Sequence, residues 1–590
     1  MRFCLPPFVV LLLIGLLPGV AHALVVQVNA PKELKPILER HLDTARAARL
    51  DEDLTEEELL RLQQASLETA RELLATEGYF SPQITSALEG TGAGRVLRYE
   101  VEAGPRTLIG AVNIRFEGAI MEESPSGVHA DKVGRRNKRL LERIERDFSL
   151  KLDMPFRQAD WDAAKQAALR PLLQNTYPAA RLAASEAKID PAAQSAALSL
   201  VIDSGPPFFY GPLQISGTER YPASIIEALN PTEPGEPFRQ QDLQDYQQLL
   251  DASGYFSLAI VAIEPDPALA VAVPIQVTVT ERKAQQLSFG VGYSTDAGAR
   301  LQATYLHRNI FGEGQRLILD GRLEDKSNLA MAELAWPRTA RGYENRMSMA
   351  YEQQDIEGQE TETWKAVISR NRRRGSIDST VSLQYQVENQ IIGTTVDEQN
   401  EALSLGYAWT HRTAGRAFYP VRGHITNLQT NVASDALLSD TSFLRLYGRH
   451  SEFFRMGAQG RLILRGEVGA VLADRREGIP TDFLFRAGGE NSVRGYDYQS
   501  LGLDVPGGVK SVRNLATASV EYNYFFTPTW GAALYVDAGD AADSFDQLSP
   551  VFGIGVGARY KSLIGPINVD LTYGEATGDV LLQFQFGVTF

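Results

Sequence analysis

Cysteine is nearly absent from the sequence, which has 590 residues and a single cysteine, Cys4. Cys4 lies ahead of the first apolar run, in a segment that we expect to be removed on export. A mature chain without thiols has no disulfide, no cysteine nucleophile and no cysteine-ligated metal. Burial, hydrogen bonds and charge pairs must therefore hold the fold together.

Positive charge and long apolar runs are also scarce. The formal net charge is −15, which argues against a nucleic-acid partner because phosphate binding needs clustered cations. Beyond the N-terminus, no stretch is long and apolar enough for a transmembrane helix. A membrane-spanning form of this chain would have to be a closed β-barrel.

The N-terminus has the pattern of a secretory signal peptide. Arg2 supplies the charge, Phe8–Leu17 is apolar, and Ala21–Ala23 has the small-x-small pattern of a cleavage site. The alternative is a membrane anchor, but the apolar run is short for a hydrocarbon layer of about 30 Å. We therefore expect export and cleavage after Ala23.

Catalytic motifs are missing as well. The sequence has no nucleophile elbow, P-loop or HExxH motif, and its histidines are scattered, with no pair at a ligand spacing. We therefore expect no enzyme, no cofactor and no metal site, with an outer-membrane hydrolase as the enzyme alternative. The histidines beyond the signal are His41, His129, His307, His411, His424 and His450.

A repeat fills the N-terminal half of the chain. Pro155–Gln158 and Pro237–Gln240 have the same letters, and each precedes an amphipathic helix pattern and an aromatic turn. A third copy keeps the helix, Glu56–Thr76, and its Gly-Tyr-Phe turn. Each copy reads strand, helices, strand, strand, which predicts helices on a three-stranded sheet. Such a sheet has edges that can accept an added strand, although the units could also serve as spacers.

Strict alternation of apolar and polar residues fills the C-terminal half, from Gln286 to Phe590. A soluble sandwich would alternate too, but the signal peptide, the aromatic strand ends and alternation up to the last residue favour a membrane barrel. About 305 residues at roughly 19 per strand and connection give about 16 strands, an allowed even number.

One glycine-rich stretch, Gly488–Tyr496, interrupts this alternation and carries Arg494. If apolar faces meet lipid, strand parity turns Glu521 and Asp537 toward the lumen. Two lumenal carboxylates need a cation, and the planar fork of arginine suits a carboxylate. We therefore predict that this loop folds into the barrel and that Arg494 pairs with Asp537, Glu521 or both. The alternative is an exposed arginine without a partner.

The first and last barrel strands form a second candidate site. Gly290 and Gly292 on the first strand and Gly587 on the last weaken strand pairing. The seam that closes the barrel could then open sideways and template a client strand, or the glycines could simply fit a crowded lumen. The apolar seam residues are Leu287, Phe289, Val291, Tyr293, Phe584, Phe586 and Phe590.

These motifs resemble the BamA/TamA superfamily of outer-membrane proteins. The repeated units are similar to POTRA domains, the four residues Val493, Arg494, Gly495 and Tyr496 to the superfamily's loop motif, and Tyr535–Gly539 to its strand motif, with Tyr in place of Phe. Arg308–Gly314 resembles a further signature near the second strand. Three units before the barrel are typical of the TamA branch.

The resemblance implies three tandem α+β POTRA domains followed by a transmembrane antiparallel β-barrel of about 16 strands. The expected boundaries are 1–23 for the signal peptide, 24–104, 105–206 and 207–283 for the POTRA domains, and 284–590 for the barrel.

The resemblance also implies a function in the outer membrane, with the POTRA domains in the periplasm. It implies insertion or translocation of outer-membrane and autotransporter proteins through a lateral seam, an inner-membrane-anchored, TamB-like partner, contact with outer-membrane lipid and a share in phospholipid transport. The alternatives are a two-partner-secretion transporter with one dedicated substrate and a diffusion porin.

Overall fold

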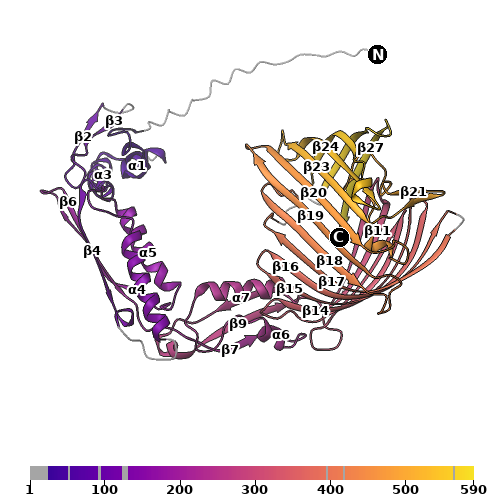
Figure 1. Cartoon of the computed structure of the whole chain (residues 1–590). Coiled ribbons are helices and arrows are strands. Elements are labelled where there is room, and N and C mark those ends of the chain that lie inside the picture. The colour runs from indigo at the N-terminus through magenta and orange to yellow at the C-terminus, as the bar shows by residue number, and fades with distance from the viewer. Residues whose placement is uncertain are drawn as a thin grey trace, which may run out of the picture. The chain divides into compact units, whose positions relative to one another are not determined.

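The computed structural model describes residues 24–50, 54–90, 95–122, 130–393, 396–415, 419–562 and 565–589. The expected signal peptide and Phe590 lie outside these ranges. The described chain contains three three-stranded sheets, a two-stranded ribbon and a closed barrel (Figure 1). The predicted fold class is therefore confirmed.

The first N-terminal unit is a three-stranded sheet with three helices. Its sheet order is β1-β3-β2, with β1 parallel to the central strand. Helix α3 begins with a capping box, in which Thr55 and Glu58 satisfy each other's backbone N–H groups. The elements are β1 (Val25–Asn29), α1 (Lys35–His41), α2 (Asp43–Arg49), α3 (Glu56–Thr76), β2 (Gln83–Glu89) and β3 (Val96–Glu102).

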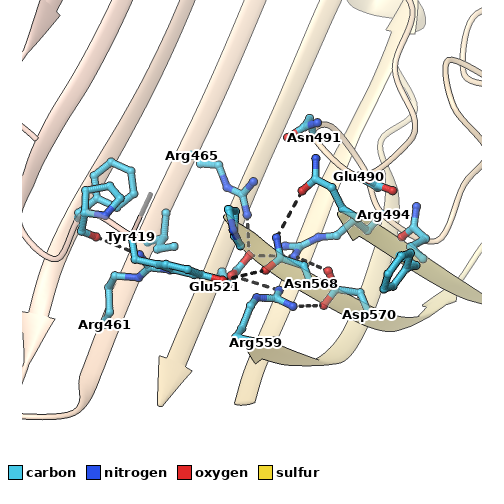
Figure 2. A pocket seen from close by; sticks show the side chains of 17 residues that line it. Tyr419, Arg461, Arg465, Glu490, Asn491, Arg494, Glu521, Arg559, Asn568 and Asp570 are labelled. Atoms are coloured by element: carbon cyan, nitrogen blue, oxygen red, sulfur yellow. Dashed lines mark hydrogen bonds and ion pairs between the residues drawn. The ribbon is translucent and has the colours of Figure 1, made fainter. Parts of the chain in front are cut away.

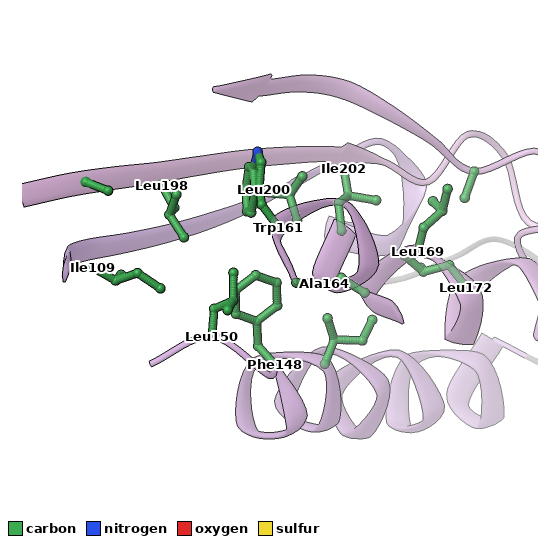
Figure 3. Packing of buried hydrophobic residues seen from close by; sticks show 14 of the residues in the cluster. Ile109, Phe148, Leu150, Trp161, Ala164, Leu169, Leu172, Leu198, Leu200 and Ile202 are labelled. Atoms are coloured by element: carbon green, nitrogen blue, oxygen red, sulfur yellow. The ribbon is translucent and has the colours of Figure 1, made fainter. Parts of the chain in front are cut away.

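The second unit repeats this arrangement in the order β4-β6-β5. Its core lies between helix α5 and the sheet, where Trp161, Leu172 and Leu200 are each at most 3% exposed (Figure 3). The elements are β4 (Leu108–Glu117), η2 (Ala119–Met121), α4 (Ala130–Asp147), α5 (Gln158–Leu173), β5 (Arg181–Asp190) and β6 (Ser195–Asp203).

The third unit has the order β7-β9-β8. As in the first two units, the last strand of the unit takes the central place in the sheet. This shared order confirms the repeat that the sequence predicts. The elements are β7 (Tyr210–Ser216), α6 (Ser224–Leu229), α7 (Gln240–Ala252), β8 (Phe256–Ala262), η3 (Pro267–Ala272) and β9 (Val273–Glu281).

The barrel has sixteen strands in sequence order and closes between β10 and β27. The end at which β10 begins is the base of the barrel, and the opposite end is its rim. The strands are β10 (Gln285–Ser294), β11 (Gly298–His307), β12 (Arg316–Glu324), β13 (Ser327–Ala335), β14 (Tyr343–Ile356), β15 (Gln359–Arg374), β16 (Ile377–Ile392), β17 (Val396–Arg412), β18 (Gly423–Ala433), β19 (Phe443–Met456), β20 (Gly460–Leu472), β23 (Asn514–Tyr524), β24 (Trp530–Ala542), β25 (Val551–Lys561), β26 (Pro566–Gly574) and β27 (Val580–Thr589).

The two faces of the barrel wall differ as a membrane requires. Outward-facing Val520 and Leu571 are 52% and 48% exposed, whereas inward-facing Glu388 and Thr572 are fully buried. An apolar outside and a polar lumen are the pattern of a transmembrane barrel. No helix among the described residues has the length and the apolar run needed to cross a membrane.

The turn Arg308–Gly314 ties the base of the barrel to the residues before it. Arg308 donates to the carbonyls of Gly254 at 2.8 Å and Lys283 at 2.9 Å. The Tyr255 hydroxyl donates to the carbonyl of Gly314. The first two barrel strands are therefore anchored where the chain enters the wall.

The connection from β20 to β23, residues 473–513, folds into the lumen; we refer to it as the inward loop. Its side chains Phe483, Phe485 and Val512 are at most 5% exposed and pack in one cluster with the wall residues Phe443 and Leu515. This apolar cluster holds the body of the loop inside the barrel. The loop contains η4 (Thr481–Phe483), β21 (Leu503–Val505) and β22 (Gly508–Lys510).

The second unit offers a direct test of its core. Leu172→Ala removes a fully buried side chain and should lower the free energy of unfolding of this unit by about 2–5 kcal/mol. Trp161 is the only tryptophan before the barrel, so urea unfolding of the whole protein in micelles can follow its fluorescence. Leu152→Ala, at a side chain that is 60% exposed, is the control and should cost less than about 0.5 kcal/mol. Equal losses would contradict the described core.

Candidate functional site

Arg494 of the inward loop lies among the charged side chains Glu521, Arg559 and Asp570 (Figure 2). Its closest partner is Asp537 on strand β24. Its Nε donates to Oδ2 of Asp537 at 2.7 Å and its Nη2 to Oδ1 at 3.0 Å. The backbone N–H of Arg494 also donates to this carboxylate, at 3.2 Å. The side chains are 3% and 1% exposed, so this is a buried bidentate ion pair.

Glu521 on β23 is the second acid at this site. It accepts from Nη1 of Arg494 at 2.8 Å, from Nη2 of Arg465 at 2.6 Å and from Nη2 of Arg559 at 3.3 Å. Nη1 of Arg559 in turn donates to Asp570 at 2.6 Å. Both predicted acids therefore contact Arg494, within a larger network of buried charges.

The loop packs closely against the barrel wall. The Arg494 guanidinium carbon lies 3.3 Å from the ring centre of Tyr535, which is a cation–π contact. Two glycines make this close approach possible. A Cβ on Gly553 would lie 1.8 Å from the carbonyl oxygen of Arg494. Gly495 has φ +92°, a conformation that glycine adopts without strain.

The remaining motif residues fix the loop on either side of the arginine. Val493 is fully buried. The Tyr496 hydroxyl donates to the carbonyl of Phe552 at 3.1 Å and accepts from the backbone N–H of Ala576 at 3.0 Å. The loop is thus attached to the connections at the rim as well as to β24.

Sequence reasoning missed the other members of the network. Arg465 and Arg461 on β20, Arg559 on β25 and Asp570 on β26 all face the lumen near Glu521. Strand parity gives their direction, but their meeting depends on the register between strands. In the described register Arg465 lies opposite Ser519, two residues from Glu521.

The expectation that the histidines are scattered is wrong for three of them. His411, His424 and His450 lie on neighbouring strands, with 3.0 Å between Nε2 of His424 and Nδ1 of His411. Nε2 of His450 lies 3.4 Å from Glu452. Residues from three strands meet here because of register, which spacing along the chain does not reveal. No group among the described residues is arranged to hold a metal ion.

The seam between β10 and β27 is short. Gly290–Ser294 pairs with Gln585–Thr589, and Gly292 lies directly opposite Gly587. By contrast, all ten residues of β10 pair with β11 on the other side. Within the described residues, the base half of β10, Gln285–Phe289, has no partner on β27. Two of the three predicted glycines therefore face each other in the least paired joint of the barrel, and Gly290 lies opposite Thr589.

The outer face of the seam is apolar, as predicted. Leu287, Phe289, Val291 and Tyr293 are 58%, 54%, 46% and 48% exposed. Across the seam, the Tyr293 ring lies 6.0 Å from that of Phe584, and the register pairs Tyr293 with Phe586. Phe590 lies outside the described residues.

A contact that the sequence does not predict joins the inward loop to the seam. The backbone N–H of Glu490 donates to Asp296 at 2.8 Å, and the backbone N–H of Thr295 donates to the Glu490 carboxylate at 3.2 Å. Thr295 also exchanges two hydrogen bonds with the backbone of Phe584 on β27, at 2.8 and 3.0 Å. The β10–β11 turn therefore contacts both the loop and the last strand.

Burial changes the acidity of the two carboxyl groups at this contact. Burial raises the pKa of Asp296 to about 6. The hydrogen bond from the N–H of Glu490 and the charge of nearby Lys326 lower this pKa but do not outweigh burial. Burial, and then the charge of Asp296, raises the pKa of Glu490 to about 7. Asp497 adds to the repulsion at Asp296 and Asp570 to that at Glu490. The docked loop therefore favours the protonated acids.

A closed barrel with an apolar outside, a lumenal loop held by a buried arginine and three small α+β units define a membrane barrel protein with POTRA-type domains. The family model described as the Omp85 superfamily domain matches residues 282–590. The POTRA model, described as a surface antigen variable number repeat, matches residues 208–282. The chain belongs to the Omp85 superfamily, so the barrel lies in the outer membrane and the POTRA domains in the periplasm.

Two relatives are named outer membrane protein assembly factor BamA. The protein from Nitratidesulfovibrio vulgaris is 23% identical over 353 residues, 56% of this chain and 44% of the relative. The protein from Neisseria meningitidis serogroup B is 23% identical over 449 residues, 67% of this chain and 55% of the relative. The chain thus spans about half the length of these curated relatives.

The solved structures support the fold. The crystal structure of BamA from Haemophilus ducreyi lacking POTRA domains 1–3 matches 82% of this chain and all of that chain, with a TM-score of 0.66 and 16% identity. The family match over residues 282–590 confirms the resemblance to the superfamily. The narrower likeness to TamA stays a prediction.

The ion pair in the loop can be tested by a double-mutant cycle. Arg494→Ala and Asp537→Ala should each lower the free energy of unfolding by about 3–5 kcal/mol. Arg494→Ala leaves the buried Asp537 without its cation, and Asp537→Ala leaves Nε and Nη2 of Arg494 without their acceptors. The double variant should lose little more than either single one, as measured by urea unfolding in lipid vesicles. Asp540→Ala is the control on the same strand, where Asp540 accepts from the backbone N–H of Ser549, and its effect should add to that of Arg494→Ala. Additive losses for Arg494 and Asp537 would contradict the pairing.

The contact between loop and seam should weaken as pH rises. The raised pKa values mean that the docked state binds more protons than the released state between about pH 4 and 7, so docking is favoured below that window and is lost through it. A spin label at Asn491 should be less mobile at pH 5 than at pH 8. Asp296→Asn, which mimics the neutral acid, should reduce this difference. An unchanged difference in that variant would rule out Asp296 as the group responsible.

Proposed function

We propose that this protein inserts or translocates outer-membrane proteins, autotransporters among them, through the seam between β10 and β27. The observation that carries the proposal is the incomplete seam, with Gly292 opposite Gly587 and the base half of β10 without a described partner on β27. The names of the two relatives, both outer membrane protein assembly factors, support the same class of function.

The chemistry of strand addition suits this seam. Unpaired backbone N–H and C=O groups on Gln285–Phe289 offer a client strand a template at the base. Each backbone hydrogen bond contributes only about 0.5–1.5 kcal/mol net, so opening the five described pairs costs a few kcal/mol. A client strand that pairs with β10 restores those bonds. The exchange therefore needs no cofactor or nucleotide.

The buried ion pairs have a positioning role in this proposal. Arg494 holds the inward loop on β23 and β24 through Glu521 and Asp537. The same loop holds the β10–β11 turn through Asp296 and Glu490. The template strand thereby keeps its place relative to β23 and β24 while the seam opens. No step of the proposed mechanism requires chemistry at these residues.

The N-terminal units would connect the barrel to a partner. Their number resembles the TamA branch, which supports an inner-membrane-anchored, TamB-like partner. The three-stranded sheets have edge strands, such as β1 and β2 in the first unit, that can accept a strand from the partner or a client. A share in phospholipid transport between the membranes belongs to the same proposal.

Locking the seam tests the proposed function. Tyr293 and Phe586 are register partners, and opposite residues of antiparallel strands lie within disulfide range. The double variant Tyr293→Cys/Phe586→Cys should, when oxidised, slow the folding of an eight-stranded barrel client into proteoliposomes at least about tenfold, a barrier increase of about 1.4 kcal/mol. Reduction should restore the rate.

The control lock joins two strands that are not expected to separate. Val556 and Leu571 are register partners on β25 and β26, and both are outward-facing at 56% and 48% exposure. The oxidised variant Val556→Cys/Leu571→Cys should assemble the client at the unmodified rate. A seam lock that leaves the rate unchanged would refute lateral opening.

A further inference from the structure

A polar cavity of about 300 Å³ lies in the lumen beside the last strands of the barrel (Figure 2). Its walls come from β19, β20, β23, β25, β26 and β27, from the inward loop, and from Tyr419 and Pro420 ahead of β18. The volume is at the lower end of the range for small-molecule sites. Four side-chain amides line it, those of Asn491, Asn568, Gln583 and Gln585, together with apolar Phe453 and Ile463.

Arg461 is the unusual member of the lining, because it is 5% exposed and forms no ion pair with an acid among the described residues. Its Nη1 donates to the carbonyl of Pro420 at 3.0 Å, and its guanidinium carbon lies 5.3 Å from the ring centre of Tyr419. Its Nε has no hydrogen-bond partner among the described residues. A buried cation is costly without a counter-charge, so this arrangement favours an anionic ligand.

The neighbouring charges do not compensate Arg461. Arg465, Arg494 and Arg559 share the three buried carboxylates Glu521, Asp537 and Asp570. Three arginines and three acids are thus joined in ion pairs, and Arg461 is the fourth cation of the group. Among the described residues, Nε of Arg465 also has no hydrogen-bond partner. Arg461 is therefore the arginine of the lining that lacks an ion pair in the part of the chain that the structure describes.

The remaining acid of the lining, Glu490, is engaged at the seam. Its carboxylate accepts from the backbone N–H of Thr295 at 3.2 Å. No ion pair among the described residues joins Glu490 to Arg461, so an incoming carboxylate would be the direct partner of this cation.

Tyr419 holds this cation in position. The Tyr419 hydroxyl donates to the carbonyl of Tyr560 at 3.2 Å and lies 3.4 Å from Oδ1 of Asn568. Its ring also contacts that of Phe525, with 5.7 Å between centres. Tyr419 is therefore held by β25 and β26, and Arg461 beside it is fixed in place before any ligand arrives. Such preorganisation lowers the entropic cost of binding.

We propose that this cavity binds the free carboxylate at the C-terminus of a polypeptide strand. The proposal rests on the proposed function, because the cavity lies directly inside β27, the strand that a client would displace. The planar guanidinium of Arg461, which has no ion pair among the described residues, suits a planar carboxylate. The amides of Asn568, Gln583 and Gln585 match peptide N–H and C=O groups, and Phe453 and Ile463 match an apolar last side chain. A cavity of this size and polarity has no room for the acyl chains of a lipid.

Peptide binding to the whole protein in lipid nanodiscs tests the proposal. The probe is a fluorescein-labelled copy of the last nine residues of the sequence, Leu582–Phe590, as the free acid and as the C-terminal amide. Fluorescence anisotropy should show at least about tenfold weaker binding of the amide, because one charge-assisted hydrogen bond is lost. Binding to the edge of β10 would be the same for both peptides, so the difference isolates the carboxylate. Equal binding of the two peptides by the unmodified protein would overturn the proposal.

Three variants assign the difference to Arg461. Arg461→Gln should abolish the preference for the free acid, and Arg461→Lys should retain part of it. Arg445→Gln is the matched control, since Arg445 also has an unpartnered Nε and stacks on the rings of Tyr447 and Phe485 but does not line the cavity. It should leave the preference unchanged. A preference that survives Arg461→Gln in barrels that keep their heat-modifiable gel mobility would overturn the assignment.

Competition distinguishes other anions and separates this proposal from the proposed function. The competitors are dihexanoyl-phosphatidylglycerol, inorganic phosphate and acetate. If either phosphate compound displaces the free-acid peptide more strongly than acetate does, the site binds phosphate and the carboxylate site is refuted.

The seam lock measures assembly, not binding. A carboxylate preference with no effect of the lock would refute lateral opening and leave the site standing, and the reverse result would refute the site alone.

Discussion

The structure of this barrel depends on keeping ionised carboxylates inside its wall. Glu521, Asp537 and Asp570 face the lumen within a few strands of each other, and charges that are buried without partners would destabilise the closed wall by several kcal/mol each. Arginines from the wall serve two of these acids, but the bidentate partner of Asp537 comes from the inward loop. Withdrawing the loop would therefore leave a buried charge without its partner, so the loop is as much a part of the wall as the strands are.

The buried ion pairs and the strand pairing together show which joint of the barrel is the weakest. Around β23 and β24, strand pairing is long and charge pairs add to it. At β10 and β27, five described pairs remain, two glycines face each other, and apolar side chains meet lipid on the outside. Charge pairs that fix β23 to β26 allow the neighbouring joint between β27 and β10 to be weakly closed without loss of the fold. The lateral opening proposed above would need this division between a rigid and a weak part of the wall.

Features that follow from the alternation of residues along one strand or the periodicity of one helix were predictable from the sequence. Features that depend on the pairing register between strands were not. Alternation along one strand placed Glu521 and Asp537 in the lumen, and helix periodicity gave α3 its bounds. Arg465 and Arg559 join the network through cross-strand neighbours, whose identity changes with every shift of register. The meeting of His411, His424 and His450 has the same origin. Asp296 and Glu490 lie 194 positions apart, and only the inward fold of the loop brings them together.

The hydrogen bonds and the ion pair of the inward loop also indicate which of the two seam strands would move. Thr295 contacts β27 through two hydrogen bonds with Phe584, whereas Asp296 and Thr295 contact the loop at Glu490. If the seam opens, the bonds to Phe584 break with the strand pairing, but those to the loop do not need to. The loop in turn stays on Asp537, since breaking that pair costs as much as opening the seam itself. The least costly opening therefore moves β27 and leaves β10 as the fixed template, which places the cavity around Arg461 beside the space that β27 vacates.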